Sequence, residues 1–167
     1  MFRLATHKDV PQLQKLLIKA WEETYKDLYS EAYIESVILE FYNYDRLMRE
    51  TSTTTKIWSG YFIIEIDNEI VGCIGGGIVD DLVGEIFVLY IDPDKKRKGY
   101  GTNLVQNFTR LQKERYSIKV QRVSVSEGNS KGIPFYEALG FKAHEVRDLY
   151  SIDDNVKSKS IVMQRTI

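Results

Sequence analysis

The 167-residue sequence contains few of the residues that build disulfides and metal sites. It has one cysteine, Cys73, and two histidines, His7 and His144, which are far apart in the chain. A single cysteine excludes a disulfide within the chain and is typical of a reducing compartment. Widely spaced histidines give no zinc-ligand pattern. We therefore expect a cytoplasmic protein without a metal centre.

The sequence also lacks long apolar runs and an excess of either charge. No apolar stretch approaches the ~20 residues of a membrane-spanning helix. Arg3, His7, Lys8 and Asp9 interrupt the start, so we expect neither a signal peptide nor a membrane partner. The 23 Lys and Arg residues balance 24 Asp and Glu residues, which does not favour nucleic acid as a partner. The length and the 43% hydrophobic content predict a single domain over residues 1–167.

One basic segment departs from this balanced composition. An apolar strand pattern, Glu85 to Ile91, leads into Lys95-Lys96-Arg97-Lys98-Gly99-Tyr100-Gly101, and a helical pattern follows directly. A helix N-terminus leaves about four backbone N–H groups unpaired and carries roughly half a positive charge. Gly99 and Gly101 tolerate φ > 0 and let the main chain approach an anion closely. The segment therefore predicts a binding site for a phosphorylated ligand.

The spacing of this loop separates it from two common phosphate-binding motifs, G-x-x-x-x-G-K-[ST] and G-x-G-x-x-G. It fits Arg/Gln-x-x-Gly-x-Gly/Ala, with Lys96 in place of Arg or Gln, and here the chain resembles the GCN5-related N-acetyltransferase (GNAT) superfamily. A second segment, Asn129 to Phe141, is similar to the later family motif Asn-x-x-Ala-x-x-x-Tyr-x-x-x-Gly-Phe, with Gly132 in place of Ala. With both motifs in the family's order, the resemblance extends over nearly the whole chain.

This resemblance implies that the chain uses acetyl-coenzyme A as a cosubstrate and transfers its acetyl group to an amine. In the family, the basic loop holds the pyrophosphate, and backbone amides of the strand before it lie beside the thioester. That strand commonly bulges there and splays from its neighbour, so the resemblance implies a bulge around Leu89, Tyr90 and Ile91. The resemblance gives these candidate cosubstrate-binding residues: Leu89, Tyr90, Ile91, Lys96, Arg97, Lys98, Gly99, Tyr100, Gly101, Thr102, Asn129 and Tyr136.

Two residues are candidates for the catalytic chemistry. A lysine-like ammonium has a pKa of ~10.4, so an amine acceptor must lose a proton before it attacks a thioester. Glu85 stands where several GNAT relatives carry a catalytic glutamate, although a solvent-facing or ion-paired strand residue is the alternative. The motif match makes Tyr136 the candidate partner of the departing thiolate. Because a phenol has a pKa of ~10 and a thiol ~8.5, we expect a hydrogen bond to sulfur more than complete protonation.

Two further features have a structural explanation beside a functional one. Cys73 would need a neighbouring base to act as a nucleophile, and no histidine is near it in the sequence, so we interpret it as a buried strand thiol. The run Gly75-Gly76-Gly77 either admits substrate close to the backbone or marks an irregular strand.

The acceptor is suggested by a third segment. Trp21-Glu22-Glu23-Thr24-Tyr25 is similar to the Trp-x-x-Thr-Tyr segment of a GNAT subgroup that includes PaiA-like polyamine acetyltransferases. Glu22, Glu23, Glu31 and Glu35 would attract a polycation, although an exposed helix face explains them equally well. We expect a small amine or polyamine acceptor. The alternatives are a protein N-terminus or lysine, or a non-catalytic acyl-CoA-binding module. The motifs are compatible with a monomer and with a homodimer.

Hydrophobic periodicity predicts an α+β fold. The patterns follow the order β-α-α-β-β-β-α-β-α-β-β, which gives a mixed central β-sheet with helices on both faces, as in the GNAT fold. The second helical region, about Glu31 to Glu50, has a break signal near Asn43. Pro134 leaves two starts open for the short helix of the second motif. That helix begins either just after Asn129 or near Ile133, with Asn129 then in the loop.

Overall fold

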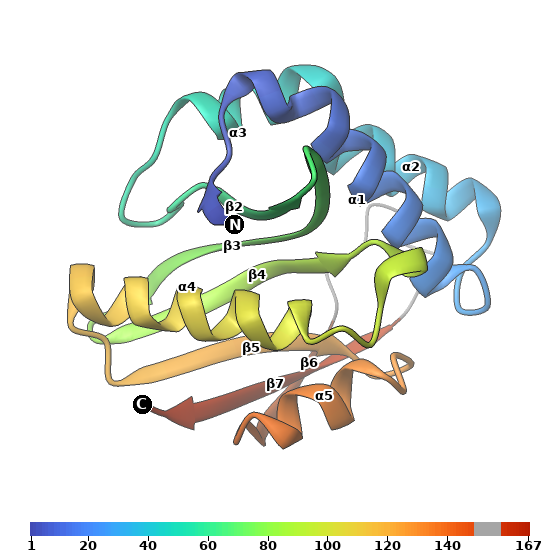
Figure 1. Ribbon diagram of the computed structural model, residues 1–167. Helices are drawn as coiled ribbons and strands as arrows, with labels where there is room; N and C mark the ends of the chain where they lie inside the picture. The colour runs from blue at the N-terminus through green and yellow to red at the C-terminus, as the bar shows by residue number, and fades with distance from the viewer. Residues whose placement is uncertain (149–157) are drawn as a thin grey trace.

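The computed structural model describes residues 1–148 and 158–167, and it confirms the expected fold class (Figure 1). The seven strands form one mixed sheet in the order β1-β2-β3-β4-β5-β7-β6. The strands are β1 (Phe2–Leu4), β2 (Tyr61–Ile66), β3 (Glu69–Asp80), β4 (Val83–Ile91), β5 (Val120–Ser126), β6 (Lys142–Asp148) and β7 (Lys159–Thr166). The helices are α1 (Val10–Tyr25), α2 (Glu31–Phe41), α3 (Tyr44–Ser52), α4 (Tyr100–Tyr116) and α5 (Gly132–Ala138), with 3₁₀ turns at His7–Asp9 and Pro93–Lys95.

Local capping sets the helix boundaries in the first third of the chain. The Asp9 carboxylate accepts a hydrogen bond from the Thr6 amide at 2.8 Å, which closes a capping box before α1. The Asn43 side chain accepts from the Arg46 amide at 2.9 Å and so begins α3. The break near Asn43 is confirmed, and the second helical region is two helices rather than one.

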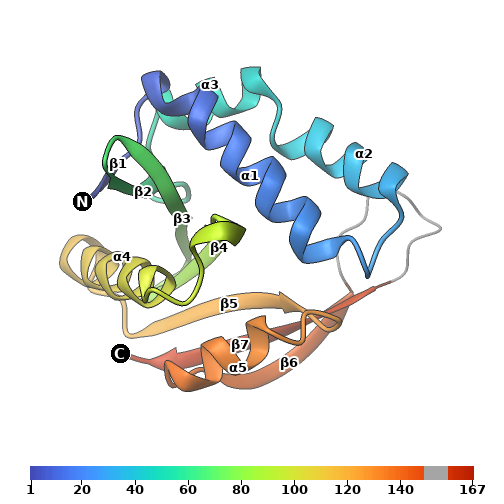
Figure 2. The ribbon, with the colours of Figure 1, turned by 45° about the vertical axis from the view of Figure 1, so that its right-hand side comes forward.

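Two apolar cores lie on the two sides of the sheet. One packs α1, α2 and α3 against it, and the other packs α4 and α5 (Figures 1 and 2). Along β2, Tyr61 and Ile63 belong to the first core, and Phe62 and Ile64 belong to the second. This division follows from the two-residue period of a strand. It also explains why β2 reads as a continuous apolar run.

Strands β4 and β5 are parallel but pair along only part of β4. The register joins Val83 to Val120 and Ile86 to Val123, and it goes no further in the described part of the chain. Strand β4 continues to Ile91, and Figure 2 shows the two strands diverging. The sheet therefore opens between β4 and β5, next to the loop that precedes α4.

The glycine run of β3 lies where other main chain crosses closely. A Cβ on Gly76 would stand 2.0 Å from the Glu85 carbonyl oxygen, and one on Gly77 would stand 2.1 Å from the Ile57 carbonyl oxygen. The register between β3 and β4 shifts at the same place. Of the two interpretations of this run, the irregular strand is confirmed.

Candidate active site

The loop before α4 leaves backbone amides open to an anion. Gly99 is the N-cap of α4 with φ of +79°, and Arg97 also has a positive φ, +66°. The first helical bond runs from the Asn103 amide to the Gly99 carbonyl at 3.0 Å. The amides from Tyr100 to Thr102 therefore have no acceptor within the helix, and the N-cap glycine has no side chain to cover them. Such amides, together with the helix dipole, form an anion site.

The basic residues of this loop are not equivalent. The Lys95 ammonium pairs with the Glu69 carboxylate at 2.9 Å, so its charge is already compensated. Lys96, Arg97 and Lys98 are exposed and form no ion pair with any residue that the structure describes. These three cations remain available to a negatively charged ligand.

Helix α1 holds the loop in position. The Lys19 ammonium contacts the Asp92 carboxylate at 2.8 Å and the Asp94 carboxylate at 2.6 Å. The Asp92 carboxylate also accepts from the Asp94 amide at 3.0 Å. Exposed ion pairs add little stability. Their effect here is to fix the loop relative to the helix that carries Trp21 and Tyr25.

The two sequence motifs lie side by side. A Cβ on Gly101 would stand 3.2 Å from the Phe135 ring, so α5 packs against the first turn of α4. Gly101 is helical, and its missing side chain serves this contact rather than a positive φ. The Asn129 side-chain oxygen accepts from the Gly132 amide at 3.0 Å. Of the two starts that Pro134 left open, the structure has the later one, with Asn129 in the loop.

In the open part of β4, alternate amides face the gap. The Asp92 amide donates to the Val71 carbonyl at 2.9 Å, on the β3 side. Because bonded and non-bonded pairs alternate in an antiparallel ladder, the Tyr90 amide also faces β3, while the amides of Leu89 and Ile91 face away from it. These last two amides point toward the space between β4 and β5.

The bulge of β4 lies earlier than expected. The family resemblance predicted it at Leu89 to Ile91, whereas the register leaves Phe87 without a partner between Ile86 and Val88. Pairing with β5 ends at Ile86. The extra twist of a bulge at this point helps to separate the two strands.

Tyr136 is buried beside this gap. It packs edge-on against Phe135 and Phe141, with ring centroids 5.0 and 5.4 Å apart. Burial, with an electrostatic contribution from Tyr25, raises the pKa of the Tyr136 phenol. Tyr136 belongs to the core under α4 and Tyr25 projects from α1, so this interaction acts across the opening of the sheet. A raised pKa makes full proton transfer to a thiolate less favourable and leaves hydrogen bonding as the available contribution.

Tyr25 belongs to a row of aromatic rings that runs along α1, the connection after it and the start of α2. Ring centroids are 4.1 Å apart for Trp21 and Tyr25, 5.5 Å for Tyr25 and Tyr29, and 4.8 Å for Tyr29 and Tyr33. Tyr25 and Tyr29 are half-buried. The sequence motif identified Trp21 and Tyr25 but missed Tyr29 and Tyr33. The spacing of four residues from Trp21 to Tyr33 was the signal for the whole row.

Glu85 lies on the α1 side of the sheet. Its neighbour Ile86 points into the core under α4, so the Glu85 side chain takes the opposite face. Burial raises the pKa of the Glu85 carboxyl, although Arg147 and its β5 neighbour Arg122 act to lower it. Among the described residues, Glu85 forms no ion pair. A half-buried carboxylate with a raised pKa is suited to accepting a proton.

Other chemistries find less support in the described part of the chain. Cys73 is buried, and burial raises the pKa of its thiol to about 12, so the reactive thiolate is scarce at neutral pH. The interpretation as a buried strand thiol is confirmed. Residues 1–148 and 158–167 contain no group of His, Cys, Asp and Glu side chains arranged for a metal ion. They also contain no helix long and apolar enough to cross a membrane.

The chain belongs to the acetyltransferase (GNAT) family, whose model matches residues 11–141. It is an acetyl-CoA-dependent N-acetyltransferase, as the two motifs predicted. It is 30% identical to a spermidine N(1)-acetyltransferase from Thermoplasma acidophilum over 142 residues, which are 83% of this chain and 85% of the relative. This match and the solved PaiA structure described next together confirm the predicted resemblance to the PaiA-like subgroup.

Solved structures agree with this assignment. The structure is similar to that of the PaiA N-acetyltransferase from Thermoplasma acidophilum in complex with coenzyme A, with a TM-score of 0.83 and 25% identity. That match covers 100% of this chain and 98% of the other. A GCN5-related N-acetyltransferase from Rhodopseudomonas palustris shares the fold, with a TM-score of 0.80, 17% identity and coverage of 100% and 95%.

Proposed function

We propose that this enzyme acetylates a small polyamine such as spermidine on a primary amine. The observation that carries the proposal is the similarity to a spermidine N(1)-acetyltransferase over more than four fifths of both chains. Polyamines are cations at neutral pH, because alkyl ammonium groups have a pKa of ~10. The half-buried rings of Tyr25 and Tyr29 offer faces that attract cations. The exposed carboxylate of Glu22, on the same helix as Tyr25, favours the same ligand, whereas the Glu23 carboxylate already pairs with Lys26 at 3.0 Å.

The pyrophosphate of acetyl-CoA is assigned to the start of α4. The first-turn amides from Tyr100 to Thr102 would donate to it, and the charges of Lys96, Arg97 and Lys98 would balance it. The positive φ of Gly99 turns the main chain toward the anion. The open amides and unpaired cations are what an anionic ligand requires.

The acetyl group is assigned to the gap between β4 and β5. The amides of Leu89 and Ile91 face this gap and would stabilise the thioester carbonyl oxygen as negative charge develops on it. The Tyr90 amide faces β3, so it does not reach the thioester. Tyr90 only separates the Leu89 and Ile91 amides along the strand. Asn129 supports α5 through its bond to Gly132 and lies at the same edge of the site.

The reaction is a direct transfer within a ternary complex. The amine nitrogen attacks the thioester carbonyl carbon, so that a carbon–nitrogen bond forms and the carbon–sulfur bond breaks. The amine proton passes to Glu85, directly or through a water, and the raised pKa of this carboxyl suits it to that role. The departing thiolate accepts a hydrogen bond from the Tyr136 hydroxyl.

Acetyl-CoA-dependent thiol release against a panel of amines tests this proposal. The panel contains spermidine, spermine, amino acids, aminoglycosides and N-terminal peptides. We expect turnover with the polyamines, and its loss in Tyr136→Phe. Turnover with the peptides alone would favour a protein N-terminus as acceptor. Acetyl-CoA binding without turnover on any amine would favour a non-catalytic acyl-CoA-binding module.

A further inference from the structure

The bulge of β4 leaves one large apolar side chain exposed near the middle of the sheet. Phe87 has no partner in the register between β3 and β4, and it is 47% exposed. Its neighbours in the strand are covered, because Ile86 is buried in the core under α4 and Val88 packs against the core under α1. The bulge therefore turns one aromatic ring out of both cores.

The alternation of side chains along β4 shows how this happens. Ile86 belongs to the α4 side of the sheet, Val88 to the α1 side and Leu89 to the α4 side again, so the two-residue period is interrupted at Phe87. In the described part of the chain, pairing with β5 ends at Ile86. Phe87 is therefore the residue at which β4 leaves β5 and the gap between the two strands begins (Figure 2).

Phe87 also lies midway between two groups that the proposed reaction uses. Glu85, the proposed proton acceptor, precedes it by two residues, and Leu89, whose amide would stabilise the carbonyl oxygen, follows it by two. Two residues of a strand span about 6–7 Å. The amine nitrogen must reach the thioester carbon and pass its proton toward Glu85, so it lies between these groups. The carbon that carries this nitrogen is then beside the Phe87 ring.

An aromatic ring in this place distinguishes amines by the shape of that carbon. An unbranched CH₂ group packs against the ring and buries apolar surface. A methyl branch on the same carbon would collide with the ring or push the nitrogen away from the thioester. A carboxylate branch would also lose water without gaining a partner from the phenyl group. The ends of a polyamine are unbranched, whereas amino acids and peptide N-termini other than glycine are branched there.

We infer that Phe87 determines acceptor specificity by selecting primary amines whose nitrogen is attached to an unbranched carbon. This inference rests on the proposed function, because it takes Glu85 and Leu89 in the roles assigned there. It adds a reason of shape for the choice of a polyamine over an amino acid.

Two amines that differ only in this branch test the inference. One is spermine, and the other is the spermine derivative with a methyl group on each terminal amine carbon. We expect the wild type to have a kcat/KM about tenfold or more higher for spermine. Phe87→Ala loses the contact with the CH₂ group and makes room for the methyl group, so this ratio should fall toward one. Phe87→Leu keeps a smaller apolar side chain and should give an intermediate ratio.

Two controls separate specificity from a general loss of activity. Leu39→Ala removes an exposed apolar side chain of α2 and should leave the ratio unchanged. The KM for acetyl-CoA should be the same in Phe87→Ala and the wild type. An equal loss with both amines in Phe87→Ala would overturn the inference, and so would a wild type that does not distinguish the two amines. Failure of the proposed function would be visible in the wild type alone, as turnover of peptides but of neither amine, and it would overturn this inference as well.

Discussion

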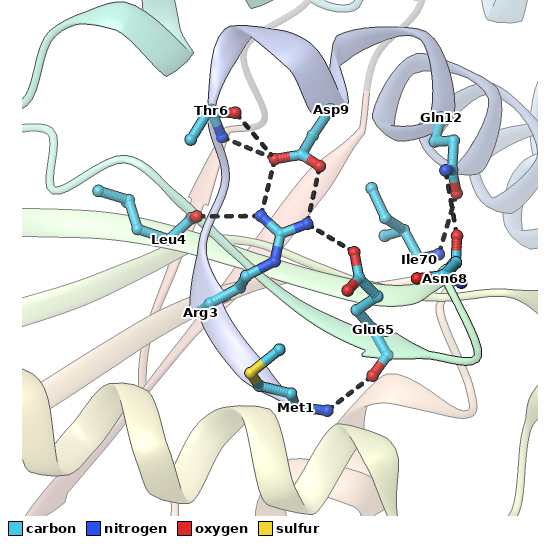
Figure 3. Close-up of polar contacts among 9 residues, drawn as sticks. All are labelled: Met1, Arg3, Leu4, Thr6, Asp9, Gln12, Glu65, Asn68 and Ile70. Carbon is cyan, nitrogen blue, oxygen red and sulfur yellow. Dashed lines mark hydrogen bonds and ion pairs between the residues drawn. The ribbon is translucent and has the colours of Figure 1, made fainter.

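A charged cluster holds the start of α1 to the edge of the sheet (Figure 3). The Arg3 guanidinium donates to both oxygens of the Asp9 carboxylate at 2.8 Å and to Glu65 at 2.6 Å. The Asp9 carboxylate also accepts from the Thr6 amide. Its side chain is 12% exposed, so solvent screens the pair only in part. We predict that Asp9→Asn measurably destabilises the fold.

The size of this effect follows from the pKa of Asp9. The hydrogen bonds from Arg3 lower it from 3.8 to about 2 against the opposing effect of burial. This difference corresponds to about 2 kcal/mol of stabilisation at neutral pH. For a chain of this length, that is about 4–8 °C in Tm. Because the folded-state pKa is the lower one, the stabilisation is complete above the unfolded-state pKa and is lost as the pH falls through the folded-state value.

Urea unfolding at a series of pH values checks this prediction. The free energy of unfolding should be about 2 kcal/mol lower in Asp9→Asn than in the wild type near pH 7. The difference should shrink as the pH falls from 3.8 toward about 2. Asp45→Asn, at an exposed carboxylate in the first turn of α3, is the matched control and should change stability by less than ~1 kcal/mol. Equal losses in the two variants, or a difference independent of pH, would refute the reasoning.

Three predictions concern the proposed site. Glu85→Gln should lower kcat by about 10²–10⁴-fold and also raise the free energy of unfolding at pH 7. The raised pKa of Glu85 means that the folded state disfavours the carboxylate. This penalty is present above the folded-state pKa and absent below the unfolded-state value of 4.5. A Glu85→Gln protein that is less stable than the wild type in urea unfolding would contradict this reasoning. Tyr136→Phe should lower kcat well beyond any change in the Kd for acetyl-CoA, and unchanged turnover would remove this hydroxyl from the mechanism. Gly99→Ala places a side chain at φ of +79°, which costs about 1 kcal/mol. The variant should weaken CoA binding up to about tenfold in calorimetry. An unchanged Kd would argue against this loop as the pyrophosphate site.

The parts of the structure that were predicted correctly depend on short-range patterns. The order of elements follows from hydrophobic periods of 2 and 3.6 residues, and the break near Asn43 follows from a cap that acts three residues along the chain. The loop before α4 could be recognised because a glycine N-cap and the helix after it are neighbours in sequence. For the same reason, the aromatic side chains that recur every four residues from Trp21 to Tyr33 could have been recognised in the sequence.

Among the features that were predicted wrongly, left open or missed, the bulge of β4 and the approach of Tyr25 to Tyr136 depend on contacts between distant segments, whereas the start of α5 depends on a local one. The bulge lies at Phe87, where the Glu85 carbonyl crosses Gly76, and no pattern within β4 alone places it there. The start of α5 was undecided because Pro134 tolerates either position in a first turn. The Asn129 side chain decides it by bonding the Gly132 amide. The approach of Tyr25 to Tyr136 needs the sheet to open between two strands, which one sequence does not reveal.

The most direct test of the proposed function is to identify the product formed from spermidine and acetyl-CoA. After incubation with the enzyme, mass spectrometry of the polyamine and a thiol assay of free CoA are carried out on the same sample. The account predicts monoacetylated spermidine in equal amount to the CoA released, and neither product at the same time point with Tyr136→Phe. Release of CoA without acetylated spermidine, or no reaction by an enzyme that binds acetyl-CoA, would contradict it.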